Sequence, residues 1–225
     1  SKMQVIICGR RTEVLEKIRE DLSKLTAVTS LCFDVSDNIQ VTKSIESIPD
    51  DFQKIDILIN NAGNAHGLDK IQDGNIEDWD KMIDSNVKGL LYVTKAVIGR
   101  MVEKSSGHII NVGSLAGREV YEKGNVYSAS KHAVNAISKG MRIDLNKNNI
   151  KVSEINPGLV ETEFSKVRFK GDPKANKVYE GYKALEANDI AEIIEFVISR
   201  PHHVNIADLL VLPQDQATSS IINKK

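Results

Sequence analysis

Three side chains between Gly113 and Lys131 have the types and spacing of one chemical device, namely Ser114, Tyr127 and Lys131. Tyr127 and Lys131 are four positions apart, so on a helix they stand one turn above each other on the same face. Ser114 comes thirteen positions before Tyr127, at the end of an apolar run that is typical of a buried strand. A strand end and a helix joined by a loop would bring the two hydroxyls together around one substrate oxygen.

The chemistry explains why these residue types occur together. A phenol has an ordinary pKa of about 10, so at neutral pH it is a poor base for an alcohol proton. Bringing that pKa close to neutrality requires roughly 3 pH units, or about 4 kcal/mol in favour of the phenolate. A lysine ammonium one helical turn away supplies the required sign of charge. The serine hydroxyl would then hold the substrate oxygen without acting as a nucleophile, because no histidine-containing triad is apparent.

The elements that must position these groups alternate along the chain. Apolar runs typical of strands alternate with amphipathic runs typical of helices, which favours a parallel sheet covered on both faces. In such sheets the ligand lies at the carboxyl ends of the strands. We expect strands at residues 3–8, 30–33, 55–59, 108–112, 151–155 and 207–212. We expect helices at residues 12–25, 38–48, 76–104, 125–146 and 188–199.

Bulk composition restricts the class of protein. The chain has 225 residues, of which 41% are hydrophobic, which suits one α/β domain over 1–225. The net charge of −1, with both signs interspersed, favours neither nucleic acid nor an anionic membrane as partner. No membrane-spanning run, signal peptide or metal-ligand spacing is visible. Cys8 and Cys32 fall inside expected strands, which predicts two buried thiols and a cytoplasmic location rather than a disulfide.

The serine, tyrosine and lysine, preceded by Asn60-Asn61-Ala62-Gly63 and followed by Pro157-Gly158, resemble the short-chain dehydrogenase/reductase family. The resemblance covers essentially the whole chain and implies a doubly wound, Rossmann-like parallel sheet in three layers. It identifies Ser114, Tyr127 and Lys131 as catalytic, with Lys131 also contacting the nicotinamide ribose. Asn86 matches the fourth catalytic position, which in the family perturbs its helix locally and holds a water that links the lysine to solvent.

One family element is absent from this sequence. Family members begin with a strand and the turn Thr-Gly-x-x-x-Gly-x-Gly, which holds the cofactor pyrophosphate at a helix N-terminus. The first expected strand here matches the family's second strand. We expect the missing segment to belong to the protein outside this sequence, rather than to have been deleted.

The pair Arg10-Arg11 falls where the family distinguishes its two nicotinamide cofactors. An acidic side chain there would bind a ribose 2′-hydroxyl, whereas arginine suits a 2′-phosphate, so we predict NADP. The resemblance further implies that the remaining cofactor contacts are made by Asp34 and Val35 at the adenine, by Asn61, Ala62 and Gly63 at the adenosine ribose, and by Pro157, Gly158, Val160 and Thr162 at the nicotinamide.

The segment from Pro157 to Asp172 resembles a subgroup that oxidises 3-hydroxy acids, including serine and allo-threonine, and reduces malonic semialdehyde. Such substrates carry a carboxylate, for which a guanidinium is a suitable bidentate partner. Arg168 is the first candidate for this role and Arg118 the second. Residues at about 160–184 are polar and weakly periodic, so we interpret them as a substrate-covering segment.

We therefore predict reversible NADP-dependent oxidation of a small 3-hydroxy acid. One alternative is a 3-oxoacyl thioester reductase, which would use the same catalytic residues. Another is a nicotinamide-binding sensor or scaffold without turnover. The resemblance implies a homodimer or homotetramer. A stripe on the long middle helix would suit that packing or an ordinary core face equally well, and comprises Val87, Leu90, Leu91, Thr94 and Val97.

Overall fold

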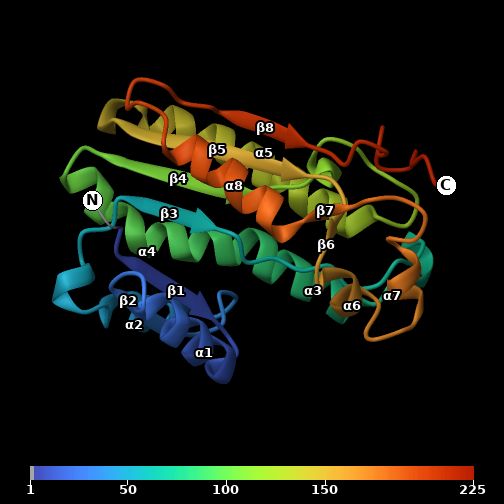
Figure 1. Ribbon diagram of the computed structural model, residues 1–225, viewed down its shortest axis with the longest axis horizontal. Coiled ribbons are helices and arrows are strands. Elements are labelled where there is room, and N and C mark those ends of the chain that lie inside the picture. The colour runs from blue at the N-terminus through green and yellow to red at the C-terminus, as the bar shows by residue number, and fades with distance from the viewer. Residues whose placement is uncertain (1–2) are drawn as a thin grey trace.

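The computed structural model describes residues 3–225, including every side chain in that range except those of residues 174 and 176. Parallel strands alternate with helices along the chain (Figure 1). This is the α/β fold that the alternating pattern predicts. The strands are β1 (Val5–Gly9), β2 (Val28–Cys32), β3 (Ile57–Asn60), β4 (Gly107–Val112), β5 (Ile150–Pro157), β6 (Val160–Glu161), β7 (Leu185–Glu186) and β8 (Asp208–Val211).

The helices lie close to the predicted ranges, and among the described residues none is both long and apolar enough to cross a membrane. They are α1 (Thr12–Ser23), α2 (Asn38–Glu46), α3 (Ile76–Ile83), α4 (Leu90–Glu103), α5 (Asn125–Leu145), α6 (Phe164–Arg168), α7 (Lys174–Lys177) and α8 (Ala187–Ile198).

The main sheet has the strand order β3-β4-β5-β8, with every pair parallel. Its side chains alternate between two cores, as the pleat requires. Ile109 packs with residues of α2 and α4 on one face, whereas Ile110 packs with residues of α8 on the other. Helices therefore cover both faces of this sheet (Figure 1), which confirms the three-layer, Rossmann-like fold.

The helix predicted at residues 76–104 is continuous but not uniform. A π-helical segment, Asp84–Gly89, joins α3 to α4. Such widened turns occur frequently at functional sites, and this one contains Asn86. The stripe on this helix is mainly a core face, because Leu90, Thr94 and Val97 are buried within the chain.

Strands β1 and β2 pair only with each other and are separate from the main sheet. A cavity of about 760 Å³ lies between β1 and β3, with side chains of both strands and of α4 in its lining. This is the place in which the family resemblance puts the strand that is absent from the sequence.

The prediction of two buried thiols is wrong. Cys8 and Cys32 are both free, as predicted, but both are exposed. The reason is that the edge of β1 that does not pair with β2 borders the open cavity, and Cys8 lies in its lining. Cys32 is the last residue of β2, where its sulfur contacts the Thr12 hydroxyl at 3.2 Å.

Candidate active site

Ser114 follows β4 at the carboxyl end of the main sheet, where ligands bind in folds of this type. It caps a short 3₁₀ turn, Leu115–Gly117, and its hydroxyl accepts a hydrogen bond from the Ala116 amide at 3.1 Å. The short turn thereby fixes the direction in which the serine leaves the sheet.

Tyr127 and Lys131 both lie on α5, one turn apart, and both are buried. The Lys131 ammonium donates to the carbonyl oxygen of Val112 at 2.9 Å, which ties the helix to the end of β4. The Ser114 hydroxyl lies close enough to Tyr127 to lower the pKa of its phenol. The predicted strand end and helix therefore do bring the serine, tyrosine and lysine together.

Asn86 joins the same site from the π-helical segment. The Asn86 side-chain amide donates to the hydroxyl of Ser130, the residue before Lys131, at 3.0 Å. Ser130 in turn donates to the Tyr127 carbonyl at 2.7 Å. Asn86 also bonds both backbone groups of Asn64 at 2.8 Å. This asparagine therefore links the loop after β3 to the helix that carries Tyr127 and Lys131.

The pKa of Tyr127 departs from the sequence-based expectation. Burial raises it to about 12, although the Ser114 hydroxyl and the Arg168 guanidinium both act to lower it. The Arg168 guanidinium carbon lies 5.5 Å from the centre of the Tyr127 ring. The nearby cation whose charge lowers the pKa of this phenol is thus Arg168.

Burial also acts on Lys131, lowering the pKa of its ammonium to about 8, while the negative charge of Glu154 opposes that shift. A buried ammonium with a single carbonyl acceptor keeps its proton only weakly. Lys131 therefore titrates close to physiological pH, far below the ordinary lysine value.

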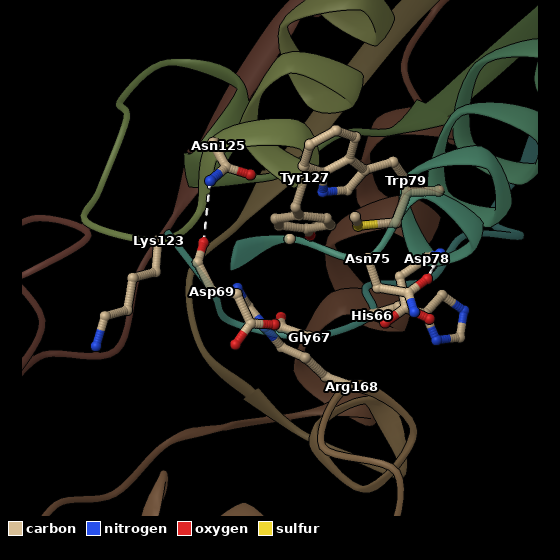
Figure 2. Close-up of a pocket in the computed structure, with 12 residues that line it drawn as sticks. His66, Gly67, Asp69, Asn75, Asp78, Trp79, Lys123, Asn125, Tyr127 and Arg168 are labelled. Atoms are coloured by element: carbon tan, nitrogen blue, oxygen red, sulfur yellow. Dashed lines mark hydrogen bonds between the residues drawn. The ribbon is translucent and has the colours of Figure 1, made fainter. Parts of the chain in front are cut away.

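Arg168 lies in the lining of a small cavity beside Tyr127, with a volume of about 10 Å³, roughly the space of one water (Figure 2). Its side chain donates through Nε to the Gly67 carbonyl at 3.2 Å, and the Gly67 amide donates back to the Arg168 carbonyl at 3.0 Å. The same guanidinium also lies 5.5 Å from the centre of the Tyr121 ring. The Arg168 guanidinium therefore lies beside the rings of both Tyr121 and Tyr127.

The predicted covering segment contains β6, α6, α7 and β7, and it is fastened over this cavity. The Lys170 ammonium pairs at 2.8 Å with the buried Asp78 carboxylate. The Phe164 ring lies 5.7 Å from the Tyr127 ring, centre to centre. Because α6 provides both Phe164 and Arg168, this segment closes the tyrosine off from solvent.

Most residues predicted at the adenosine end of the cofactor line the 760 Å³ cavity together: Arg10, Asp34, Val35, Asn61, Ala62 and Gly63. Arg10 pairs with Asp34 at 3.3 Å and is 65% exposed, so its guanidinium is accessible to a phosphate. Arg11 is placed differently, because it pairs with Glu163 at 3.1 Å and is not in this lining. The exposed Arg10 guanidinium beside the loop Asn61–Gly63 fits the adenosine end of NADP.

The residues predicted near the nicotinamide follow β5. Pro157 ends that strand, Val160 begins β6, and the Thr162 hydroxyl accepts from the Phe164 amide at 3.2 Å. At Gly158 an added Cβ would lie 2.2 Å from the Gln216 amide oxygen, so a larger residue would displace the Gln216 side chain. These four residues occupy the same edge of the sheet as Ser114, outside the lining of the larger cavity.

Three residues around Tyr127 are marked by no sequence motif, and the candidate Arg118 lies away from the cavity beside Tyr127. Arg118, the second candidate for the carboxylate, forms an ion pair with Asp208 and does not line the cavity beside Tyr127. Conversely, His66, Trp79 and Phe164 surround Tyr127 although no motif marks them. Their contacts depend on how the loop after β3 and the covering segment pack.

Comparison with known proteins supports the motif-based resemblance. The family model described as short chain dehydrogenase matches residues 1–173. The chain is 43% identical over 220 residues to the NADP-dependent 3-hydroxy acid dehydrogenase YdfG of Escherichia coli, an alignment covering 97% of this chain and 88% of that protein. It is 42% identical to the NADP-dependent 3-hydroxy acid dehydrogenase of Schizosaccharomyces pombe, an alignment that covers 100% of this chain and 88% of that protein. It is 39% identical to sulfoacetaldehyde reductase 2 of Chromohalobacter salexigens, with 96% and 86% covered.

Solved structures agree. The closed form of serine dehydrogenase complexed with NADP+ superposes with a TM-score of 0.92 at 42% identity, covering 99% of this chain and 90% of that one. The serine dehydrogenase of Escherichia coli superposes with a TM-score of 0.81 at 37% identity, covering 95% and 88%. With the family model, the relatives and the clustered Asn86, Ser114, Tyr127 and Lys131 in agreement, the chain belongs to the short chain dehydrogenase family.

Proposed function

We propose that this protein is an NADP-dependent oxidoreductase that interconverts the hydroxyl and carbonyl forms of a small 3-hydroxy acid. The observation that carries the proposal is the position of Arg168, whose guanidinium carbon lies 5.5 Å from the centre of the Tyr127 ring, while Ser114 acts on the same phenol. The hydroxyls suit the reacting oxygen, and the guanidinium suits a carboxylate a few bonds away. Serine, allo-threonine and the pair of 3-hydroxypropionate and malonic semialdehyde have this arrangement of groups.

The relatives support the same substrate class. Two of them are named for 3-hydroxy acids, and a third is named for sulfoacetaldehyde, in which a sulfonate takes the place of a carboxylate. All three names describe a small molecule with an anionic group near the reacting carbon. A guanidinium such as that of Arg168 would bind either anion.

The chain's own residues have separate roles in the proposed reaction. Tyr127 exchanges the proton of the substrate hydroxyl, Ser114 orients the oxygen, and Arg168 supplies positive charge that favours the phenolate. Lys131, which donates to the Val112 carbonyl, contacts the nicotinamide ribose. Asn86 holds the loop after β3 against α5 and supports the proton path. NADP, when bound, supplies or accepts the hydride.

The relative affinities for NADPH and NADH test the predicted roles of Arg10 and Arg11. We expect Arg10→Ala to weaken NADPH binding about 10-fold to 100-fold and NADH binding little, because a charge-assisted bond to phosphate is worth about 1.5–3 kcal/mol. Fluorescence titration of each cofactor measures this without turnover. Arg11→Ala is the matched control, since Arg11 pairs with Glu163 and does not line the cavity. Equal losses for the two variants, or for the two cofactors, would contradict the assignment.

Substrate binding gives a second test. We expect Arg168→Ala to raise the KM for a 3-hydroxy acid about 10-fold to 100-fold, because an ionic hydrogen-bonded pair is lost. The KM for a neutral alcohol of similar size should change much less. Lys166→Ala, on the same short helix, is the control for a general loss of positive charge. If Arg168→Ala affects both substrates equally, the guanidinium does not bind the carboxylate.

The alternatives are separated by substrate. An acyl thioester reduced with NADPH faster than malonic semialdehyde would favour a 3-oxoacyl reductase. Cofactor binding without turnover of either compound would favour a sensor or scaffold. A homodimer or homotetramer and a cytoplasmic location remain predictions, the first of which sedimentation analysis would test.

A further inference from the structure

The backbone amide of Ser114 is held by a side chain of the neighbouring strand. The ladder between β4 and β5 continues as far as the Gly113 amide, which donates to the Ile155 carbonyl at 2.8 Å. The next amide, that of Ser114, donates instead to the Asn156 side-chain oxygen at 3.0 Å. Asn156 is completely buried. The polypeptide therefore turns away from the sheet at the point where a side chain replaces the backbone as acceptor.

The residue before Ser114 leaves space for this contact. A Cβ added at Gly113 would lie 2.1 Å from the Asn156 oxygen, so any larger residue would displace that oxygen. Glycine at this position thus permits the close approach of the two strand ends. The contact between the Ser114 amide and the Asn156 oxygen therefore depends on glycine at position 113 and on asparagine at position 156.

The orientation of the Asn156 amide is set from the next strand. Its Nδ2 donates at 2.9 Å to Asp208 in β8, and the same carboxylate oxygen accepts a hydrogen bond from Arg118. An amide has its donor and its acceptor on different atoms, so an acceptor at Asp208 makes the oxygen face Ser114. Arg118 lies just beyond the turn that Ser114 caps, so this carboxylate restrains the turn at both of its ends.

We infer that Asn156 is a positioning residue, which with Asp208 holds the turn between Ser114 and Arg118 and thereby directs the Ser114 hydroxyl at Tyr127. The inference rests on the proposed function only in its assumption that Ser114 orients the reacting oxygen. Without an acceptor at position 208, the Asn156 amide can rotate and present its donor to the Ser114 amide. Two donors then face each other, and the turn shifts.

Asp208 provides the decisive pair of variants. Its side chain is 35% exposed at the edge of the sheet, so substitution there is compatible with folding. Asp208→Asn and Asp208→Ala both remove the charge that pairs with Arg118, but only asparagine keeps an acceptor for Asn156. We expect Asp208→Ala to lower kcat about 10-fold to 100-fold with a smaller change in KM, as a misplacement of about 1 Å does. Asp208→Asn should retain kcat within about threefold, the margin expected when the hydrogen bond survives.

The Glu154 carboxyl also interacts with the Asn156 amide. A second pair of variants therefore tests the contact between Asn156 and Asp208 by changing both of its partners. Asn156→Asp removes the donor and sets a third carboxyl beside Asp208 and Glu154. The double variant Asn156→Asp with Asp208→Asn restores a donor and an acceptor with their places exchanged. We expect the double variant to recover most of the kcat that Asn156→Asp loses.

Hydrogen–deuterium exchange at the Ser114 amide reports the contact without cofactor or turnover. We expect faster exchange in Asp208→Ala and unchanged exchange in Asp208→Asn. Equal behaviour of these two variants in both kcat and exchange would overturn the inference, as would a double variant no better than Asn156→Asp. Ser114→Ala separates the two proposals. If it retains turnover, the proposed role of Ser114 fails, whereas the exchange result still decides whether Asn156 holds the turn.

Discussion

Replacing Tyr127 with phenylalanine is expected to lower NADPH-dependent turnover by about 10³-fold, within the 10²-fold to 10⁴-fold range of general acid–base catalysis. The substitution removes one hydroxyl from a buried ring and keeps the ring's packing against Phe164 and Arg168. The cofactor affinity and the melting temperature should therefore change little. Steady-state kinetics on malonic semialdehyde, with cofactor titration alongside, measures the effect.

Tyr121→Phe is the matched control for this experiment. The Arg168 guanidinium lies at the same distance, 5.5 Å, from both tyrosine rings, but it is Tyr127 whose phenol pKa the Ser114 hydroxyl lowers. Loss of the Tyr121 hydroxyl should leave turnover within a few-fold of the unaltered protein. Turnover retained by Tyr127→Phe would contradict the proposed proton transfer, and with it the enzyme mechanism.

Replacing Lys131 with methionine is expected to abolish most turnover and yet to stabilise the fold. The lysine is 7% exposed, and burial lowers its pKa to about 8 from 10.5. At pH 7 the folded protein therefore retains a buried ammonium at a cost of up to about 3 kcal/mol. Methionine avoids that cost but loses the hydrogen bond to Val112, so we expect a net gain of about 1–2 kcal/mol in the free energy of unfolding.

The pH dependence of this gain identifies its cause. Between pH 8 and pH 10.5 the unfolded chain binds the lysine proton and the folded chain has lost it. The stability of the unaltered protein therefore rises with pH across this window relative to the methionine variant. The advantage of Lys131→Met should be largest below pH 8 and disappear towards pH 10.5.

Urea unfolding at several pH values measures that difference. Lys139→Met, at an exposed position of the same helix, is the control and should show neither the gain nor the loss of turnover. A Lys131→Met protein that is less stable at every pH would show that the lysine is not held as a costly buried cation. Full turnover in this variant would remove it from the reaction.

The effect of a cation on the pKa of the Tyr127 phenol depends on its position in space more than on its spacing along the sequence. The four-residue separation of Tyr127 and Lys131 correctly places them on one face of α5. It does not show that burial raises the pKa of the phenol, or that the cation acting on it is Arg168, 41 residues further along the chain. Burial and through-space charge depend on packing, which spacing along one helix does not describe.

The sequence by itself determined the alternation of strands and helices, the family and the four clustered residues. These properties depend on local periodicity and on motifs whose geometry a single strand end or helix turn imposes. Only the tertiary structure decided that Arg118 pairs with Asp208, that Arg11 turns to Glu163, and that both cysteines are exposed. Those outcomes depend on which side chains from distant strands arrive at the same place, because a charged or polar group takes the partner that folding brings nearest.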